Sequence, residues 1–257
     1  MAGVRRERDG TVGILTLDDP ATLNAMTPQL LDDLASAIAE MTSDPAVRCL
    51  VLTGAGRGFC SGQNLKAGDV FPEGVAAGVM KHYWPAFRAI RECSVPVVVA
   101  VNGVAAGGGC SLALAGDLVV AARTASFIQV FSRIALVPDL GSTWLLPRLV
   151  GRQRALDMML LNEPLSAERA HAWGIVRELF DAADLMAGAM ALAARLAEGP
   201  TRALAATRRL VDDGEHTTYQ EQFRRELEVQ AAVRTGPDAL EGRAAFAQRR
   251  RPKFIGR

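Results

Sequence analysis

The amino-acid sequence predicts an α/β fold followed by a purely helical C-terminal region. Short apolar runs typical of buried strands alternate with segments of helical periodicity, which favours parallel strands joined by helical crossovers. Beyond about residue 150 the strand patterns fade and helical patterns follow one another. The chain has 257 residues, enough for one large domain with an appendage. We therefore expect a core over residues 1–195 and a helical region over residues 196–257.

Local patterns predict the individual elements. The alternating run TVGILTLDDP predicts a strand that stops at Pro20. The following segment, residues 27–44, has helical periodicity, with Thr27 as its N-cap and Pro28 at the first helical position. Buried strands are expected at residues 46–54, 94–103 and 117–122. Later helices are expected at residues 151–162, 166–174, 182–199, 217–234 and 237–250.

Composition and charge disfavour several function classes. The formal net charge is +1, so no strong field favours nucleic acid or an anionic membrane as partner. The four cysteines have neither a C-x-x-C spacing nor a metal-ligand spacing, which favours free thiols in a reducing compartment and no metal. We find no signal-peptide pattern and no apolar run of about 18 residues, so we expect a cytoplasmic protein without a transmembrane helix.

Two glycine-rich segments follow predicted strands. The first, LVLTGAGRGFCSGQNL, has the spacing G-x-G-x-G and no clear helix after it, so it is a weak match to a dinucleotide site. The second, AVNGVAAGGGCSLALAGD, begins a helix near residues 107–109. Backbone N–H groups at a helix start carry the positive end of the dipole, which suits an oxyanion hole. Close packing of the helix against a strand explains the same glycines equally well.

The second segment also offers a serine. Ser111 lies near a strand–turn–helix junction, loosely like the nucleophile elbow of serine hydrolases. The elbow needs a glycine two residues before and after the serine, but Ala113 follows here. A hydrolase is therefore a minor alternative.

A third segment, LVPDLGSTWLLP, holds one acid among apolar and small residues. A carboxylate beside Pro138 on a loop that enters a helix is a candidate general base or nucleophile. Asp139 could instead cap the helix, although Ser142 or Thr143 could also do that.

Together and in this order, these segments closely resemble the crotonase superfamily, which contains the enoyl-CoA hydratases and isomerases. The likeness extends from LNAMTPQLLDDL to EGRAAFAQRRRPKF and covers essentially the whole chain. It implies a spiral of strand–strand–helix repeats with a helical C-terminal region that makes trimers, or hexamers as paired trimers. It also implies an acyl-CoA thioester substrate and no cofactor beyond the coenzyme A of that substrate.

The resemblance assigns roles to residues. The thioester oxygen would lie between the backbone N–H groups of Gln63 and Gly108. The neighbouring motif residues expected to bind the substrate are Ser61, Gly62, Asn64, Leu65 and Gly107. Hydratases of the superfamily use two glutamates, and Ser111 and Phe131 occupy those positions here, so efficient hydration is not expected.

Asp139 takes the position of an acid that certain isomerases use as a base and a dehalogenase uses as a nucleophile. The dehalogenase pattern expects Trp and His where Phe131 and Trp84 stand. The surrounding motifs are most similar to the phenylacetate-degradation isomerases, which rearrange a ring epoxide to an oxepin and shift enoyl double bonds. We therefore expect an acyl-CoA isomerase with Asp139 as its base. Weak hydratase activity and a non-catalytic acyl-CoA-binding role remain alternatives.

Further residues complete the expected site. Phe131 and Trp144 would form an apolar wall that raises the pKa of Asp139. Residues 66–94 resemble a lid, on which Tyr83 would face the acyl group, or would be an ordinary core aromatic. Lys253, in the basic run RRRPKF, would meet CoA phosphates, or belong to a solvated tail.

Overall fold

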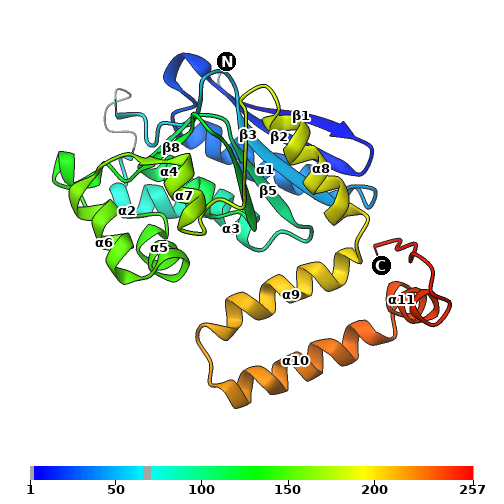
Figure 1. Ribbon diagram of the computed structural model, residues 1–257. Helices are drawn as coiled ribbons and strands as arrows, with labels where there is room; N and C mark the ends of the chain where they lie inside the picture. The colour runs from blue at the N-terminus through cyan, green and yellow to red at the C-terminus, as the bar shows by residue number, and fades with distance from the viewer. Residues whose placement is uncertain (1–2, 66–70, 257) are drawn as a thin grey trace.

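The computed structural model describes residues 3–65 and 71–256, and its body is built around a six-stranded sheet (Figure 1). The strand order is β1-β2-β3-β5-β7-β10. β1 and β2 are antiparallel, and every later neighbour pairs in parallel. The strands are β1 (Gly3–Asp9), β2 (Val12–Asp18), β3 (Cys49–Gly54), β5 (Val97–Val101), β7 (Leu118–Ala122) and β10 (Glu178–Phe180).

A second, four-stranded sheet has the order β4-β6-β8-β9. Its strands are β4 (Gly58–Cys60), β6 (Val104–Ala106), β8 (Ser126–Ile128) and β9 (Leu165–Ser166). β3, β5 and β7 of the large sheet are each followed directly in the chain by a strand of the small sheet, and helices separate these pairs. This repetition of strand, strand and helix confirms the predicted spiral.

Helices surround the sheets (Figure 1). They are α1 (Pro28–Ser43), α2 (Val75–Gly78), α3 (Trp84–Arg91), α4 (Gly108–Leu114), α5 (Ser142–Val150), α6 (Arg152–Leu161), α7 (Ala167–Ala172) and α8 (Leu185–Ala197). A π-helical turn, η3 (Val79–Tyr83), joins α2 to α3, and the 3₁₀ turns are η1 (Pro20–Thr22) and η4 (Phe131–Ile134). The predicted cap of α1 is confirmed, because the Thr27 side chain accepts a hydrogen bond from the Leu30 N–H.

Apolar side chains from α1 and the central strands form the core. Leu30, Leu31 and Leu34 of α1 are fully buried, as are Val98 and Val99 of β5. α8 packs against β3 and β5. A rigid sheet between helices thus carries the loops in which the three sequence motifs lie.

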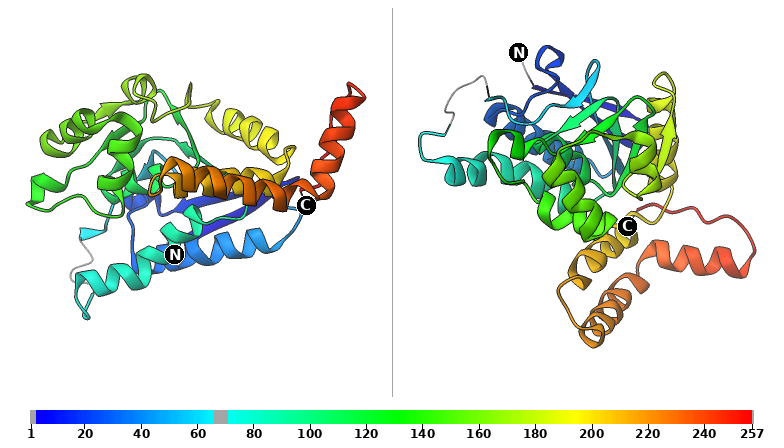
Figure 2. Two further views of the ribbon diagram at one scale, coloured as in Figure 1. Left: turned by 90° about the horizontal axis from the view of Figure 1, so that it is seen from below. Right: turned by 60° about the vertical axis from the view of Figure 1, so that its left-hand side comes forward.

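The last three helices project from the body (Figures 1 and 2). They are α9 (Thr201–Gly214), α10 (Tyr219–Arg234) and α11 (Pro237–Ala247). α9 and α10 form an antiparallel hairpin, and the chain then returns toward the end of α8 (Figure 1). No helix in the described part of the chain is long and apolar enough to cross a membrane.

Candidate active site

Two of the glycine-rich segments meet at the N-terminal end of α4. Gly62 has a φ of +89°, a conformation that glycine adopts without strain. A side chain here would have its Cβ only 2.8 Å from the Ala106 carbonyl oxygen and 3.4 Å from the Gly108 nitrogen. The segment after β4 therefore lies directly against the start of α4.

The backbone N–H of Gln63 points away from the neighbouring segment around Met26. Met26 and Gln63 form a parallel β-bridge. The Met26 N–H donates to the Gly62 carbonyl at 2.7 Å, and the Asn64 N–H donates to the Met26 carbonyl at 3.0 Å. In a parallel bridge of this kind, the two neighbours of Gln63, Gly62 and Asn64, make the hydrogen bonds to Met26. The N–H of Gln63 itself therefore points away from Met26.

The N–H of Gly108 lies at the first position of α4, where a helix has no internal acceptor to offer. The same peptide is fixed at its other end, because the Gly107 carbonyl accepts from the N–H groups of Cys110 at 2.9 Å and Ser111 at 3.2 Å. Within residues 3–65 and 71–256, neither this N–H nor that of Gln63 has a recorded protein acceptor. The two amides can receive one oxygen that gathers negative charge.

The sequence leaves two roles open for the glycine triplet, an oxyanion hole and close helix–strand packing, and the three glycines differ in their surroundings. A Cβ on Gly109 would collide with the backbone carbonyl of Cys60, so this glycine serves packing. A Cβ on Gly108 would instead collide with the flexible end of Met26 and approach Leu140 Cδ1 at 2.9 Å. Gly107 has a φ of +53° and starts the helix.

Asp139 lies on a loop with an unusual backbone. Val130, Ala135 and Leu140 have φ values of 51°, 57° and 50°, in a region that residues with side chains seldom adopt. Strained backbone of this kind persists only where the surrounding structure holds it, and it is common at functional sites. The loop ends at Gly141, with a φ of 85°, which is the N-cap of α5.

The Asp139 carboxylate is not used as a helix cap, since no side chain caps α5. Within the described residues it has no ion-pair partner. Although the residue is exposed in the single chain, partial burial of its carboxyl is the main cause that raises its pKa above 3.8. A lone carboxylate with a raised pKa is a candidate general base.

Two further predicted residues lie near these groups. Phe131 is 9% exposed, and its ring reaches within 3.9 Å of the Cβ position of Gly107. Tyr83 is buried in the core beside Phe71 with a ring-centroid distance of 5.7 Å. Burial and then the charge of Asp139 raise the pKa of the Tyr83 hydroxyl, so this side chain is a core aromatic whose polar end lies near the base.

Ser111 does not have the surroundings of a hydrolase nucleophile. Its side chain is fully buried and its Oγ lies 2.7 Å from the Oγ of Ser142. The three histidines are engaged elsewhere: His171 Nδ1 with the Val176 carbonyl, His82 Nδ1 with Asp32, and His216 against Trp144. No histidine is recorded beside Ser111 to take its proton.

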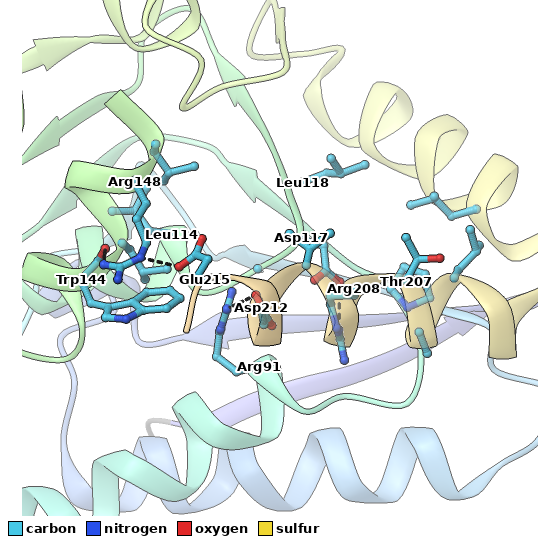
Figure 3. Close-up of a pocket in the computed structure, with 18 residues that line it drawn as sticks. Arg91, Leu114, Asp117, Leu118, Trp144, Arg148, Thr207, Arg208, Asp212 and Glu215 are labelled. Carbon is cyan, nitrogen blue, oxygen red and sulfur yellow. Dashed lines mark hydrogen bonds and ion pairs between the residues drawn. The ribbon is translucent and has the colours of Figure 1, made fainter. Parts of the chain in front are cut away.

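Trp144 packs among side chains of α5 and of the segment that follows α9. Its ring packs against His216 at 5.7 Å and under the Arg148 guanidinium at 4.1 Å. Figure 3 shows it in the cavity of about 410 Å³ between the body and α9. The recorded contacts of Trp144 therefore belong to the docking of α9 rather than to a wall around Asp139.

Lys253 lies at the opposite end of the large sheet. The tail is held by Arg48, whose guanidinium donates to the Phe254 carbonyl at 3.0 Å and to Thr201 Oγ1 at 3.1 Å. Arg48 immediately precedes β3, whereas the Gln63 loop comes after β3 and the short strand β4. The six residues of β3 alone span roughly 16 Å. The structure thus does not bring Lys253 to the amides of its own chain.

The remaining predicted residues lie around the Gln63 loop. Ser61 donates through Oγ to the Thr22 carbonyl at 2.8 Å, so its hydroxyl braces the loop. Asn64 contributes its N–H to the bridge with Met26, and Leu65 is 62% exposed at the end of this segment. Of the expected lid, residues 66–70 lie outside the described residues, and the rest forms α2, η3 and α3.

Two residues that had no predicted role in catalysis or substrate binding are also part of the site. Met26 holds the Gln63 loop through its backbone and touches the Gly108 position through its side chain. Ser142 joins Ser111 beneath the Asp139 loop. The motif LNAM was a signal for the first, but no local pattern distinguishes Ser142 from a helix cap.

The sequence and the fold are similar to those of several known proteins. Residues 7–257 match the profile of the family described as Enoyl-CoA hydratase/isomerase. The chain is 42% identical to the Escherichia coli protein named 1,2-epoxyphenylacetyl-CoA isomerase, over 95% of this chain and 94% of that one. It is 39% identical to a Rhodobacter capsulatus protein named "Probable enoyl-CoA hydratase", over 99% and 98% of the two chains. The crystal structure of an enoyl-CoA hydratase from a Polaromonas species superposes with a TM-score of 0.92 at 31% identity, covering 98% and 99%.

Proposed function

The chain belongs to the enoyl-CoA hydratase/isomerase family, and from this premise we propose that it is an acyl-CoA isomerase whose general base is Asp139. One observation carries the proposal. Within the described residues, the backbone amides of Gln63 and Gly108 have no protein acceptors, and they lie beside the loop of a carboxylate without a cationic partner. The class of substrate is an acyl-CoA thioester.

The two amides act on the thioester carbonyl. When a proton leaves a carbon next to or conjugated with that carbonyl, the negative charge gathers on its oxygen as an enolate. Gln63 and Gly108 then donate two preorganised hydrogen bonds to the oxygen. Loss of one such donor typically costs about 3 kcal/mol of transition-state stabilisation.

Asp139 moves the proton. Its ionised carboxylate accepts the proton from one carbon, becomes neutral, and returns the same proton to another atom of the acyl group. The product has the composition of the substrate, so the reaction consumes no water and no added cofactor. Burial raises the pKa of Asp139, and a raised pKa makes its carboxylate a better base.

The acyl group of first choice is an aryl-derived one. The E. coli relative is named for a ring epoxide of phenylacetyl-CoA, and it shares 42% of its residues with this chain. Apolar neighbours of the amides, such as Phe131 and Leu140, suit a hydrocarbon ring better than a polar chain. We therefore place ring-epoxide and enoyl thioesters at the head of the substrate panel.

Hydration is the second candidate, because the R. capsulatus relative is named as a hydratase. Adding water needs groups that hold and deprotonate it. The positions where hydratases carry two glutamates hold Ser111, whose hydroxyl is occupied by Ser142, and Phe131. We expect slow or undetectable hydration of crotonyl-CoA.

The test follows a panel of enoyl-CoA and ring-epoxide acyl-CoA thioesters by absorbance and mass. Asp139→Asn should fold normally and lose at least about a hundredfold in turnover, the usual scale for a general base. Asp157→Asn, which changes an exposed acid on α6, is the matched control and should keep full activity. Near-full turnover by the Asp139 variant, or rapid conversion of crotonyl-CoA to the 3-hydroxyacyl thioester, would refute the proposal.

A further inference from the structure

A pair of buried hydroxyl groups lies beneath the Asp139 loop. Ser111 and Ser142 are both fully buried, and their Oγ atoms are 2.7 Å apart. Ser111 Oγ also lies 3.2 Å from the Asp139 carbonyl oxygen and 3.5 Å from that of Gly107. The pair therefore joins α4 to the loop that carries the base.

The direction of these hydrogen bonds follows from the available acceptors. A hydroxyl has one proton, and a carbonyl can only accept. Ser111 has carbonyl oxygens within reach, the nearer being that of Asp139, so its proton goes there. Ser142 has no other recorded side-chain partner in the described chain, so its hydroxyl donates to Ser111 Oγ. The result is a chain of donors from Ser142 through Ser111 to the Asp139 carbonyl.

The Asp139 carbonyl thus receives two hydrogen bonds. The second comes from the Ser142 N–H at 3.1 Å. Directly after this carbonyl the backbone turns through Leu140 and Gly141, with φ values of 50° and 85°. A left-handed leucine is costly and persists only where the surroundings hold it. The two bonds to the carbonyl are what fix the start of this turn.

On its other side Ser111 contacts the peptide of an oxyanion amide. The Ser111 N–H donates to the Gly107 carbonyl at 3.2 Å, and the same peptide unit carries the Gly108 N–H. One residue therefore touches the peptide that presents the oxyanion donor and the peptide that presents the base. A direct link of this kind fixes the distance between them.

We infer that Ser111 is a positioning residue, which holds the Asp139 base in register with the Gly108 amide and depends on Ser142 for its own orientation. The inference rests on the proposed function of Asp139. Ser111 itself touches no reacting atom, because its side chain is fully buried and directed at the loop backbone.

Four variants test the inference. Ser111→Ala and Ser142→Ala remove the hydroxyls, Ser111→Cys fills the space with a poor hydrogen-bond donor, and Thr143→Ala changes an exposed hydroxyl one residue away. The three serine variants should lose about tenfold to a hundredfold in kcat, since small displacements of a catalytic group have effects of this size. KM should stay within about threefold, because the substrate-binding surface is unchanged.

The double variant and an isotope measurement separate positioning from general stability. Ser111→Ala with Ser142→Ala should be no slower than either single variant, since the two hydroxyls act as one unit. In deuterated water the serine variants should incorporate more solvent deuterium into the product, because a loosened base returns its proton late. Thr143→Ala should match the wild type in both measurements.

Hydrogen–deuterium exchange gives a readout that does not need activity. The amides of residues 139–145 should exchange faster in Ser111→Ala and Ser111→Cys than in the wild type, because the Asp139 carbonyl has lost a donor. Wild-type kcat and unchanged exchange in these variants would overturn the inference while leaving the role of Asp139 intact. An inactive wild type on the whole panel would instead refute the proposed function, and the exchange data alone would then decide whether Ser111 holds the loop. If Ser111→Ala fails to fold, Ser142→Ala and Ser111→Cys carry the same comparison.

Discussion

The Asp139 carboxylate has no cationic partner in the part of the chain that the structure describes, and burial raises its pKa above 3.8. A raised pKa means that the folded chain binds this proton more tightly than the unfolded chain does. The free energy of unfolding therefore decreases as the pH rises from the ordinary pKa through the raised one, and the full penalty is present above the raised pKa. Function and stability oppose each other at this residue.

We predict that Asp139→Asn unfolds at the same or a higher temperature than the wild type at pH 7, because asparagine removes the charged form. The gain should shrink as the pH falls below the raised pKa, because the wild-type carboxyl then becomes protonated in the folded chain. Thermal unfolding at several pH values measures this. A variant that is less stable at pH 7 would show that the ionised carboxylate contributes to the fold.

The same ionisation should govern the rate. The base must be deprotonated to accept a proton, so kcat/KM should fall with decreasing pH through an apparent pKa above the ordinary aspartate value of 3.8. A pH–rate profile on the best thioester of the panel checks this. A limb at or below the ordinary value of 3.8 would contradict the burial of this group.

Adjacent glycines of the triplet should respond differently to the same substitution. Gly108→Ala meets the flexible end of Met26, so the fold should persist while the oxyanion amide is displaced and turnover falls by about a hundredfold. Gly109→Ala meets the Cys60 backbone, which cannot move aside, so it should unfold at a much lower temperature. Measurements of kcat and of the unfolding temperature distinguish the two variants. If Gly108→Ala and Gly109→Ala had the same effect on kcat and on the unfolding temperature, the two glycines would not have different roles.

At the scale of single elements, α9 is docked on the body through a largely buried ion pair. Arg208 Nη1 lies 3.0 Å from Asp117 Oδ2, and the side chains are 11% and 19% exposed. Burial is the main cause that raises the pKa of Asp117, and the charge of Arg208 opposes the shift. Arg208 also donates to the Cys93 carbonyl, so it bridges α9 to two segments of the body.

Arg208→Ala should therefore destabilise the chain by roughly 3 kcal/mol or more, because it leaves a buried carboxylate unpaired. Arg209→Ala, at the exposed neighbouring position of the same helix, is the control and should cost less than about 0.5 kcal/mol. Denaturant unfolding measures both. Equal stability of the two variants would mean that the ion pair contributes nothing net to the docking of α9.

The predictability of an element depended on how much of it is buried. The valine-rich strands β3, β5 and β7 were predicted because a parallel strand buried on both faces is apolar throughout. The sequence did not predict β1, because it is a charged edge strand whose Arg6 and Arg8 pair with Asp33 and Asp44. The three-residue strands β4, β6 and β8 are too short to show a period.

The site divides in the same way. Gly108 and Asp139 were identifiable because a glycine triplet and a lone acid in an apolar loop are visible in the sequence itself. The roles of Ser142 and Met26 depend on which loop meets which helix, and that is decided by tertiary packing. Trp144 was expected near the base because it is close in sequence, but the turn at Gly141 and the helix that follows direct its ring to α9.

At the scale of the whole molecule, the projecting helices leave large apolar side chains uncovered. Those at least half exposed on α10 and α11 are Tyr219, Phe223, Leu227, Leu240 and Phe246. A second exposed group, Leu136, Val137, Leu160 and Leu161, lies on the loop before Asp139 and on α6. Apolar surface of this extent on a projecting helical arm favours contact with other subunits.

We therefore predict that the protein is a trimer, or a hexamer of two trimers, in light scattering, as closed rings of identical contacts satisfy every subunit. Phe246→Asp and Tyr219→Asp, at side chains that are 87% and 85% exposed in the single chain, should cost the isolated fold little. At a subunit interface they should weaken assembly, because a charge replaces an apolar contact. Turnover should fall together with the trimer, because we expect a neighbouring subunit to cover Leu136 and Val137, which are exposed beside the base in the single chain.

A truncated chain gives a second test of the predicted assembly. A chain that ends after Gly199 keeps α8 complete and lacks α9, α10 and α11. It should be insoluble or a monomer without activity, because it loses both the Arg208–Asp117 pair and the apolar faces of the arm. A soluble, active monomer from this truncation would show that the arm serves neither assembly nor the site, and unchanged trimers of both aspartate variants would place the subunit contact on another face.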